Sequence, residues 1–392
     1  MKKRNRILLC LVTAGMITAS NAHAGNEAAS NDELTERIIR LEEKLKTGGL
    51  PEAWADRITL SGVLEVEAGY EKMDYAGAGS EDESSSDLAL ATASIGVDAK
   101  ISDYLSGHIV LLWEEDETEP VDMDEGFMLL DGGDTLPLYL KAGKTYVPFG
   151  KFESNMISDP LTLELGETRE TALETGFHAG GFHGAVYAFN GDMDIEGDEN
   201  HIDNYGITAG FTMEKEGFAL DVGVGWINNI FDSDGLTDLA EESAAEAREL
   251  GFSLSLKERI QGIAAHGVIT AGPVTLIGEY VAMLEDIEVS MADITPGTLA
   301  ALGLGSAAKG EKLAAWNLEA GYGLELLGKE TVFGVSFQGV TDAEEGFPEN
   351  RYLGVINVGI MKNTSLAMEY RHDEYETDDS ADTLTMQLAV TF

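Results

Sequence analysis

The strongest constraint on the fold is an alternation of apolar and polar residues with a period of two, which recurs from residue 58 onward. In ITLSGVLEVEAGY, Leu64, Val66 and Tyr70 share one face, whereas Glu65 and Glu67 lie on the other. A strand places successive side chains on opposite faces, and no helix does so. The pattern predicts about sixteen strands, at 58–70, 87–101, 105–115, 122–131, 136–147, 169–179, 182–191, 203–215, 217–229, 257–271, 274–285, 312–326, 329–341, 350–361, 364–375 and 381–392.

The connections between these strands alternate in length. Those after the even-numbered strands are short, such as ISDYL, AGG and MKNT, whereas those after the odd-numbered strands are mostly longer and acidic. The two longest cover residues 231–251 and 285–312. Such sorting is typical of an up-and-down barrel in an outer membrane, with tight periplasmic turns and longer outer loops. We therefore predict an all-β transmembrane barrel of about 16 antiparallel up-and-down strands. A secreted soluble β-protein, the alternative, gives no reason for this sorting.

The first 24 residues have the pattern of a secretory signal peptide. MKKRNR supplies the basic region, ILLCLVTAGMITA the apolar region, and A-H-A a cleavage site that ends at Ala24. The single cysteine, Cys10, lies within this signal, so we expect neither a disulfide nor thiol chemistry in the processed chain. No later stretch approaches the roughly 18 apolar residues of a membrane helix. A secreted chain of this kind can still enter a membrane as a closed barrel.

Residues 30–46, SNDELTERIIRLEEKLK, are predicted to form a short helix. Leu34, Ile38, Leu41 and Leu45 recur at four, three and four residues, which is the spacing of a coiled-coil seam. Two heptads are too short to be stable alone. The helix therefore either lies on another surface or self-associates, and self-association would allow a homotrimer. The predicted division is a signal peptide over 1–24, a periplasmic helix and linker over 25–56, and an outer-membrane barrel over 57–392.

The C-terminal stretch LTMQLAVTF alternates up to its last residue, Phe392. We predict that it is the closing strand of the barrel and pairs with the first strand, so that no sheet edge remains. It also resembles the C-terminal signature of bacterial outer-membrane proteins, an alternating strand with a terminal phenylalanine. That resemblance implies recognition of Phe392 by the barrel assembly machinery and a C-terminus in the periplasm.

Charged residues fall on the polar faces of the predicted strands, which would line the barrel interior because a charge facing lipid costs on the order of 2–4 kcal/mol. The chain has 71 acidic and 25 basic residues, a formal net charge of −46, which excludes nucleic acid as a partner. An acidic interior concentrates cations and repels anions, so we predict a cation-selective channel. The acidic residues predicted to line it are Glu65, Glu67, Asp98, Asp221, Glu279, Glu319 and Glu369.

Residues 141–172 interrupt the strand pattern. Val147-Pro148-Phe149-Gly150 ends a strand, since proline cannot donate to the ladder, and Ser158-Asp159-Pro160 predicts a turn. By position this is the third outer loop, which in sixteen-stranded barrels often folds inward and narrows the pore; an external cap is the alternative. The candidates for the constriction and for ligand binding are Lys141, Lys144, Pro148, Phe149, Gly150, Lys151, Glu164, Arg169 and Arg371, whose five cations would form a basic patch.

The block GKTYVPFGKFESNMISDPLTLELGETRET, together with the signal peptide, the short coiled coil and the terminal phenylalanine, resembles the LbtU-type siderophore porin family. The resemblance covers about residues 32–392 and is most specific over 143–171. It implies a passive outer-membrane channel for ferric siderophores that lacks the plug domain of energy-coupled receptors. Many ferric siderophores are neutral or anionic, so an acidic channel would need the basic patch to bind one. The alternatives are a general cation-preferring diffusion porin and a structural barrel that sheaths an envelope complex.

No catalytic constellation is evident, and we predict neither an enzyme nor a bound cofactor or metal. His178 and His183 flank a Gly-Gly turn, and residues 114–117 are Glu-Glu-Asp-Glu. Carboxylate oxygens can chelate hard cations, but an exposed acidic loop is more simply a solvated surface. The fourth outer loop is calcium-like in composition without the spacing of an EF-hand, and its acidic residues are Asp192, Asp194, Asp198 and Glu199.

Overall fold

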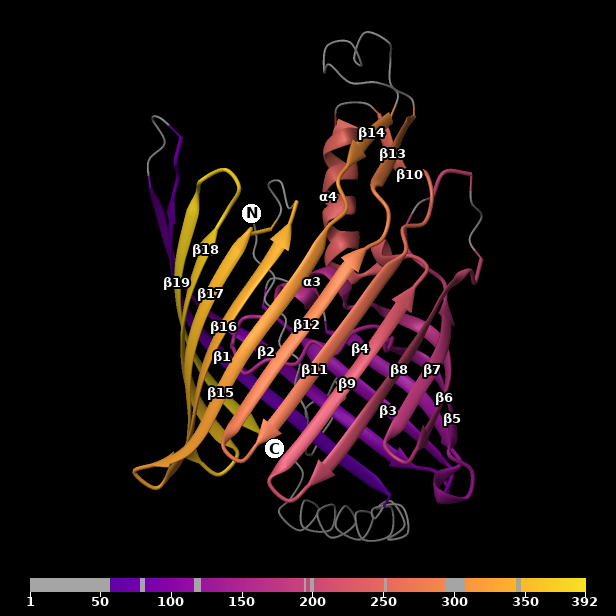
Figure 1. The fold of residues 1–392 in the computed structure, drawn as a ribbon, viewed down its shortest axis with the longest axis vertical. Coiled ribbons are helices and arrows are strands. Elements are labelled where there is room, and N and C mark those ends of the chain that lie inside the picture. The colour runs from indigo at the N-terminus through magenta and orange to yellow at the C-terminus, as the bar shows by residue number, and fades with distance from the viewer. Residues whose placement is uncertain are drawn as a thin grey trace, which may run out of the picture.

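The computed structural model describes residues 57–77, 82–115, 121–193, 195–197, 201–249, 252–292, 307–342 and 347–392. The predicted signal peptide and N-terminal helix lie outside these residues. In the described part the chain forms a closed antiparallel barrel of sixteen strands, as predicted (Figure 1). Its strands are β1 (Ile58–Asp74), β2 (Glu83–Lys100), β3 (Leu105–Trp113), β4 (Asp122–Asp131), β5 (Leu138–Tyr146), β6 (Arg169–Ala179), β7 (Phe182–Phe189), β8 (Asn204–Lys215), β9 (Phe218–Ile227), β11 (Gly262–Ala271), β12 (Val274–Met283), β15 (Ala314–Leu326), β16 (Lys329–Thr341), β17 (Asn350–Met361), β18 (Thr364–Glu374) and β19 (Ser380–Thr391).

The barrel closes between its first and last strands. Val66 of β1 lies opposite Leu388 of β19, and the pairing runs from Val63 with Thr391 to Asp74 with Ser380. The backbone of Phe392 also exchanges two hydrogen bonds of 3.0 Å with Gly62. The predicted pairing of the first and last strands is therefore confirmed.

The two faces of the strands differ as the alternation requires. On β1, Leu64 and Val66 are 43% and 39% exposed, whereas the intervening Glu65 is 3% exposed. The same holds on β19, where Leu384, Met386 and Leu388 are exposed. Apolar side chains thus cover the outside of the barrel, and polar ones point inward.

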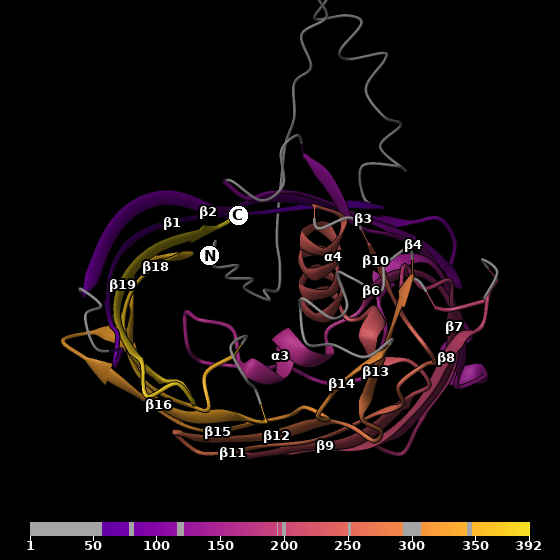
Figure 2. The same cartoon turned by 90° about the horizontal axis from the view of Figure 1, so that it is seen from above.

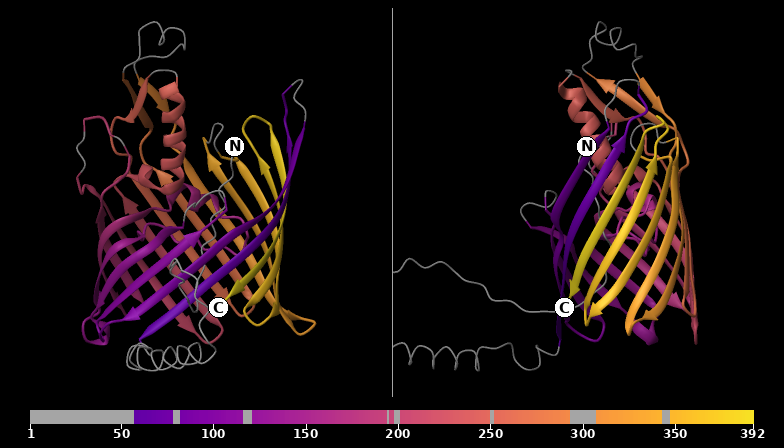
Figure 3. Two further views of the ribbon diagram at one scale, coloured as in Figure 1. Left: turned by 180° about the vertical axis from the view of Figure 1, so that it is seen from behind. Right: turned by 90° about the vertical axis from the view of Figure 1, so that its left-hand side faces the viewer.

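The two longest connections carry structure that the sequence analysis did not predict. Residues 231–251 begin in a short 3-10 turn, η2 (Ile230–Asp232), and then form the helix α4 (Asp234–Glu249). Strands β10 (Ser253–Leu256), β13 (Ile287–Ala292) and β14 (Ala307–Gly310) make a separate three-stranded sheet. Figure 3 shows α4 and this sheet at the end of the barrel opposite the C-terminus. Another 3-10 turn, η1 (Gly133–Thr135), joins β4 to β5.

Several strand boundaries differ from the prediction by a few residues, and the largest difference is at the start of β11. The strand expected over 257–271 begins only at Gly262. The reason is Ile260, whose N–H donates to Oδ1 of Asn229 at 3.2 Å and whose carbonyl accepts from the N–H of Ile230 at 2.8 Å. These bonds join the chain to η2 before the strand starts. No helix in the described part of the chain is long and apolar enough to cross a membrane.

Candidate functional site: a loop fastened inside the barrel

The connection between β5 and β6, residues 147–168, is called the third loop below. It folds into the barrel, as one of the two alternatives predicted, and includes the short helix α3 (Leu161–Gly166). Figure 2 shows α3 inside the ring of strands, beside β12 and β15. Leu161, Leu163 and Leu165 of α3 are at most 4% exposed and belong to a core that also contains Ile230 of η2. One side of the barrel interior is therefore filled by packed apolar side chains.

The loop enters the barrel through a tight contact with β9. A side chain at Gly225 would place its Cβ 2.2 Å from the carbonyl oxygen of Phe149, so only glycine admits the loop there. Phe149 itself is buried. Gly150 faces the ring of Phe152, which adopts a φ of 57°, a left-handed conformation that is costly for a phenylalanine. Of the predicted constriction residues, Phe149 thus belongs to the core and Gly150 to a packed turn.

A buried carboxylate on β12 holds the start of the third loop. Glu279 accepts hydrogen bonds from the backbone N–H of Lys151 at 2.7 Å and of Phe152 at 3.0 Å. The hydroxyl of Thr162 donates to the same side chain at 3.0 Å. A buried hydrogen-bond donor that lacks an acceptor costs free energy. Glu279 therefore holds both the start of the loop, at Lys151 and Phe152, and the helix α3, at Thr162.

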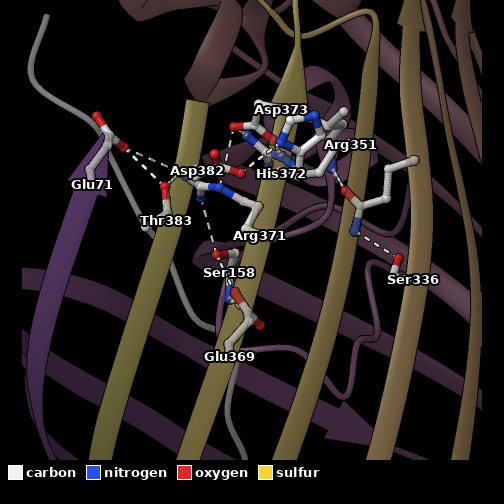
Figure 4. Close-up of polar contacts among 12 residues, drawn as sticks. Glu71, Ser158, Ser336, Arg351, Glu369, Arg371, His372, Asp373, Asp382 and Thr383 are labelled. Atoms are coloured by element: carbon white, nitrogen blue, oxygen red, sulfur yellow. Dashed lines mark hydrogen bonds and ion pairs between the residues drawn. The ribbon is translucent and has the colours of Figure 1, made fainter. Parts of the chain in front are cut away.

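Two further carboxylates hold the tip of the loop. Glu319 on β15 accepts from the N–H of Asn155 at 2.6 Å and from the hydroxyl of Ser154 at 2.8 Å. Glu369 on β18 accepts from the N–H of Ile157 at 2.5 Å and from the hydroxyl of Ser158 at 2.6 Å (Figure 4). All three carboxylates were predicted to line the channel, and the structure instead places the third loop directly on them.

A buried ion network on β17 and β18 supports the far end of the loop (Figure 4). Arg371 donates to the hydroxyl of Ser158 at 3.1 Å and lies 3.2 Å from Asp373, measured between Nε and Oδ2. Arg351 donates to the other oxygen of Asp373 at 2.8 Å. Since the side chain of Arg371 is only 4% exposed, it supports the loop and is not presented to a solute.

The remaining predicted cations do not form a basic patch. All four have carboxylate partners: Lys141 lies 2.6 Å from Glu174, Lys151 lies 3.1 Å from Asp221, and Arg169 lies 2.7 Å from Asp124, while Lys144 and Arg169 both lie 3.5 Å from Oδ2 of Asp122. The alternation of β5 also puts Lys144 on the face of the exposed Leu138 and Leu140, and Lys141 on the other face. Lys144 and Arg169 thus meet at Asp122, whereas Lys141 and Lys151 bind other carboxylates, and the four cations do not form one ligand-binding group.

The other candidates occupy varied positions. Glu164 lies half-buried in the first turn of α3, and Pro148 precedes the contact with Gly225. Glu67 accepts from the amide of Gln387 at 2.9 Å, whereas Glu65 is buried beside it on β1. Sequence reasoning missed Asp373 and Arg351, and it also missed Glu125, whose position in DMDEGF is obscured by a bulge that shifts the register of β4. The alternation of inward and outward positions along their strands is the sequence signal that could have identified them.

The outer loops are fastened to the third loop by polar contacts. The N–H of Asp234 donates to the carbonyl of Glu167 at 2.8 Å. Asp232 accepts from the amides of Asn229 at 2.6 Å and Asn204 at 2.8 Å. Burial raises the pKa of Asp232, and the hydrogen bonds from the N–H of Met193 and the amide of Asn229 oppose that rise.

No group of three or more His, Cys, Asp or Glu side chains in the described residues is arranged to hold a metal ion. Of the acidic residues predicted in the fourth outer loop, Asp192 is described by the structure, whereas Asp194, Asp198 and Glu199 are not. Glu114 and Glu115 are described and residues 116–117 are not. His178 stacks on Tyr139 with ring centroids 5.0 Å apart.

No family model matches the chain. It is 27% identical over 354 residues to a UPF0422 protein of Coxiella burnetii, which covers 88% of this chain and 70% of that protein. It is 26% identical over 302 residues to a UPF0422 protein of Legionella pneumophila subsp. pneumophila, covering 73% of this chain and 54% of that protein. The chain thus spans about half the length of this second relative.

Two solved structures share the fold. The outer membrane channel DcaP of Acinetobacter baumannii matches with a TM-score of 0.54 and 11% identity, over 86% of this chain and 97% of that one. An anion-selective porin from Comamonas acidovorans matches with a TM-score of 0.53 and 10% identity, over 86% and 99%. The barrel therefore has the fold of outer-membrane porins.

Proposed function

We propose that this chain is an outer-membrane porin, a channel and not an enzyme, through which small solutes diffuse passively with a preference for cations. The observation that carries the proposal is the third loop, which lies inside a closed barrel and is held against one wall by Glu279, Glu319 and Glu369. In this proposal the loop narrows the water-filled interior and leaves a path along the opposite wall. The porin fold and the apolar outer face support the same function.

In this proposal the apolar outer face contacts outer-membrane lipid, and the end that carries α4 faces outward. The N-terminal helix and the C-terminus would lie in the periplasm, and the barrel assembly machinery would recognise Phe392, the residue that follows β19. A homotrimer is the proposed assembly, and cross-linking of the mature protein with and without residues 25–50 tests whether the N-terminal helix is needed for it.

Ferric siderophore uptake is the second candidate. Its support is that the block resembling siderophore porins, residues 143–171, contains the loop that enters the barrel. The pairing of Lys141 with Glu174, and of Lys144 and Arg169 with acidic residues of β4, weighs against binding of an anionic complex, because no cation among them lacks a carboxylate partner.

Single-channel conductance of the refolded protein in a planar bilayer tests these proposals. We expect discrete conductance steps that are indifferent to ferric siderophores and a reversal potential in a KCl gradient that favours potassium. Block of the steps by one siderophore at micromolar concentration would instead support the second candidate. Silence under every condition would contradict both and favour a structural barrel that sheaths an envelope complex.

A further inference from the structure

The carboxylates inside the barrel differ in how accessible they are to a passing solute. Glu279, Glu319 and Glu369 are at most 5% exposed and are occupied by the third loop. Glu174 is 4% exposed and bound to Lys141. The first three carboxylates accept hydrogen bonds from the loop backbone, and the fourth is paired with a cation. Loop backbone or a cation therefore lies against each of these groups, and none of them is presented directly to a solute.

A second group of carboxylates is partly exposed but neutralised. Asp221 and Glu153 both lie 3.1 Å from Nζ of Lys151. Glu71 lies 3.8 Å from Arg371. Lysine and arginine stay charged at neutral pH, so each of these acids lies beside a permanent cation, which Asp221 and Glu153 share.

Asp98 and Glu125 differ from both groups. Their side chains are 42% and 24% exposed, and in the described part of the chain their ion-pair partner is His108 alone. Nδ1 of His108 lies 2.7 Å from Asp98, and Nε2 lies 3.9 Å from Glu125. Glu125 also accepts from the hydroxyl of Thr145 at 3.1 Å, which adds no charge. The two carboxylates therefore share one histidine, and no lysine or arginine of the described residues lies within ion-pair distance of either.

Strand register places these residues on one inner surface. Asp98 of β2 lies opposite His108 of β3, and Val110 of β3 lies opposite Glu125 of β4. The intervening side chains point outward, as the exposure of Ile109 and Met128 shows. This surface belongs to the wall away from α3, whose contacts are with β12, β15 and β16 (Figure 2).

We propose that Asp98 and Glu125 are the residues that set the charge selectivity of the channel, and that they favour small cations. The inference rests on the proposed porin function and assigns its selectivity to two named side chains. The third loop and the core occupy the other side of the interior, so a solute travels along the wall that carries these carboxylates. Uncompensated charge beside a low-dielectric wall raises the local concentration of counter-ions.

The test is the reversal potential of single channels in a KCl gradient. For Asp98→Asn combined with Glu125→Gln, we expect the cation-to-anion permeability ratio to fall by roughly threefold or more, since clefts lined by one sign of charge carry potentials of several kT. Glu125→Lys should lower the ratio further. The matched control is Asp131→Asn, an exposed charge at the end of β4 whose Oδ1 only accepts from the N–H of Gly133.

Folding of each variant is verified by its heat-modifiable migration on gels, and the single substitutions carry the test if the double variant does not fold. An unchanged ratio in Asp98→Asn and Glu125→Gln, in channels that conduct and prefer cations, would overturn this inference and leave the porin function intact. An equal drop in Asp131→Asn would also overturn it. A wild-type protein without conductance would instead overturn the porin function itself.

Discussion

Two walls of the same barrel use the same residue types for different purposes. On β12, β15 and β18, the carboxylates of Glu279, Glu319 and Glu369 are buried and accept hydrogen bonds from the third loop. On β2 and β4, Asp98 and Glu125 remain partly exposed, with only a histidine between them. An inward glutamate is therefore a structural acceptor where a loop covers it and an electrostatic element where none does.

The physical difference is desolvation. A carboxylate removed from water must recover its lost hydrogen bonds from the protein, and the backbone of the third loop supplies them. A carboxylate that keeps its water needs no such partner and projects its charge into the interior. Substitutions on the first wall should therefore change stability and loop position, whereas those on the second should change selectivity.

The largest expected effect is that of Glu369→Ala on the loop-bearing wall. The change removes the acceptor for Ile157 and Ser158 and weakens the compensation of the buried Arg371. Breaking a buried charged network by removing one partner costs about 3–5 kcal/mol. Urea unfolding of the protein in detergent micelles measures this loss, and single-channel recording should show noisier and larger steps. The control is Glu374→Ala on the same strand, whose side chain is 47% exposed; equal unfolding midpoints for the two variants would contradict the interpretation.

Leu165→Ala should be next in size. Leu165 is completely buried in the core that joins α3 to the outer loops. Deleting a buried leucine side chain costs about 2–5 kcal/mol because a cavity remains. The same urea titration measures it, with Leu173→Ala as the control because Leu173 is 55% exposed on the outside of β6. If both variants lose the same stability, the interior core is not what holds the loop.

The barrel itself could be predicted from the sequence because the alternation is strict where one face meets lipid and the other does not. Strand number and barrel closure followed from period and loop length, whereas the inward course of the third loop was one of two alternatives that the sequence left open. The tertiary partners did not follow. Nothing local to Glu369 indicates that it binds Ser158, since that contact spans 211 residues. Arg371 was therefore expected to bind a solute, although it supports the loop.

The structure above the barrel was missed for a different reason. Residues 231–251 are rich in acidic and small residues, a composition that is typical of a solvated loop. The helix α4 forms there because Leu236 and Ala247 pack inward while its other side stays in water. Two buried positions among the described side chains of a 16-residue helix are a weak periodic signal.

Glu319→Gln should lower the free energy of unfolding by less than the two variants above. Its comparison with Glu125→Gln tests the difference between the two walls directly. The amide keeps one acceptor oxygen for the N–H of Asn155 but loses the second, so a loss of about 1–2 kcal/mol is expected. Glu325→Gln, at an exposed position on the same strand, is the control. Glu125→Gln on the opposite wall should change stability by less than about 0.5 kcal/mol. A comparable loss of stability in Glu125→Gln would mean that the two walls do not differ as described.

The smallest expected effect is a difference in the cation-to-anion permeability ratio between substitutions of two lysines on β5. Lys141 balances the buried Glu174 inside the barrel, whereas Lys144 lies on the opposite face of β5 and pairs with Asp122. Lys141→Met leaves an uncompensated carboxylate on the interior wall, so the cation-to-anion permeability ratio should rise by roughly twofold. Lys144→Met removes the same charge from the other face and should leave the ratio unchanged, with a stability change below about 0.5 kcal/mol because that pair is partly exposed and Asp122 keeps Arg169 at 3.5 Å. Reversal potentials of the two variants, measured side by side, decide the matter: equal shifts would show that the charge selectivity responds to total charge and not to the face on which each lysine stands.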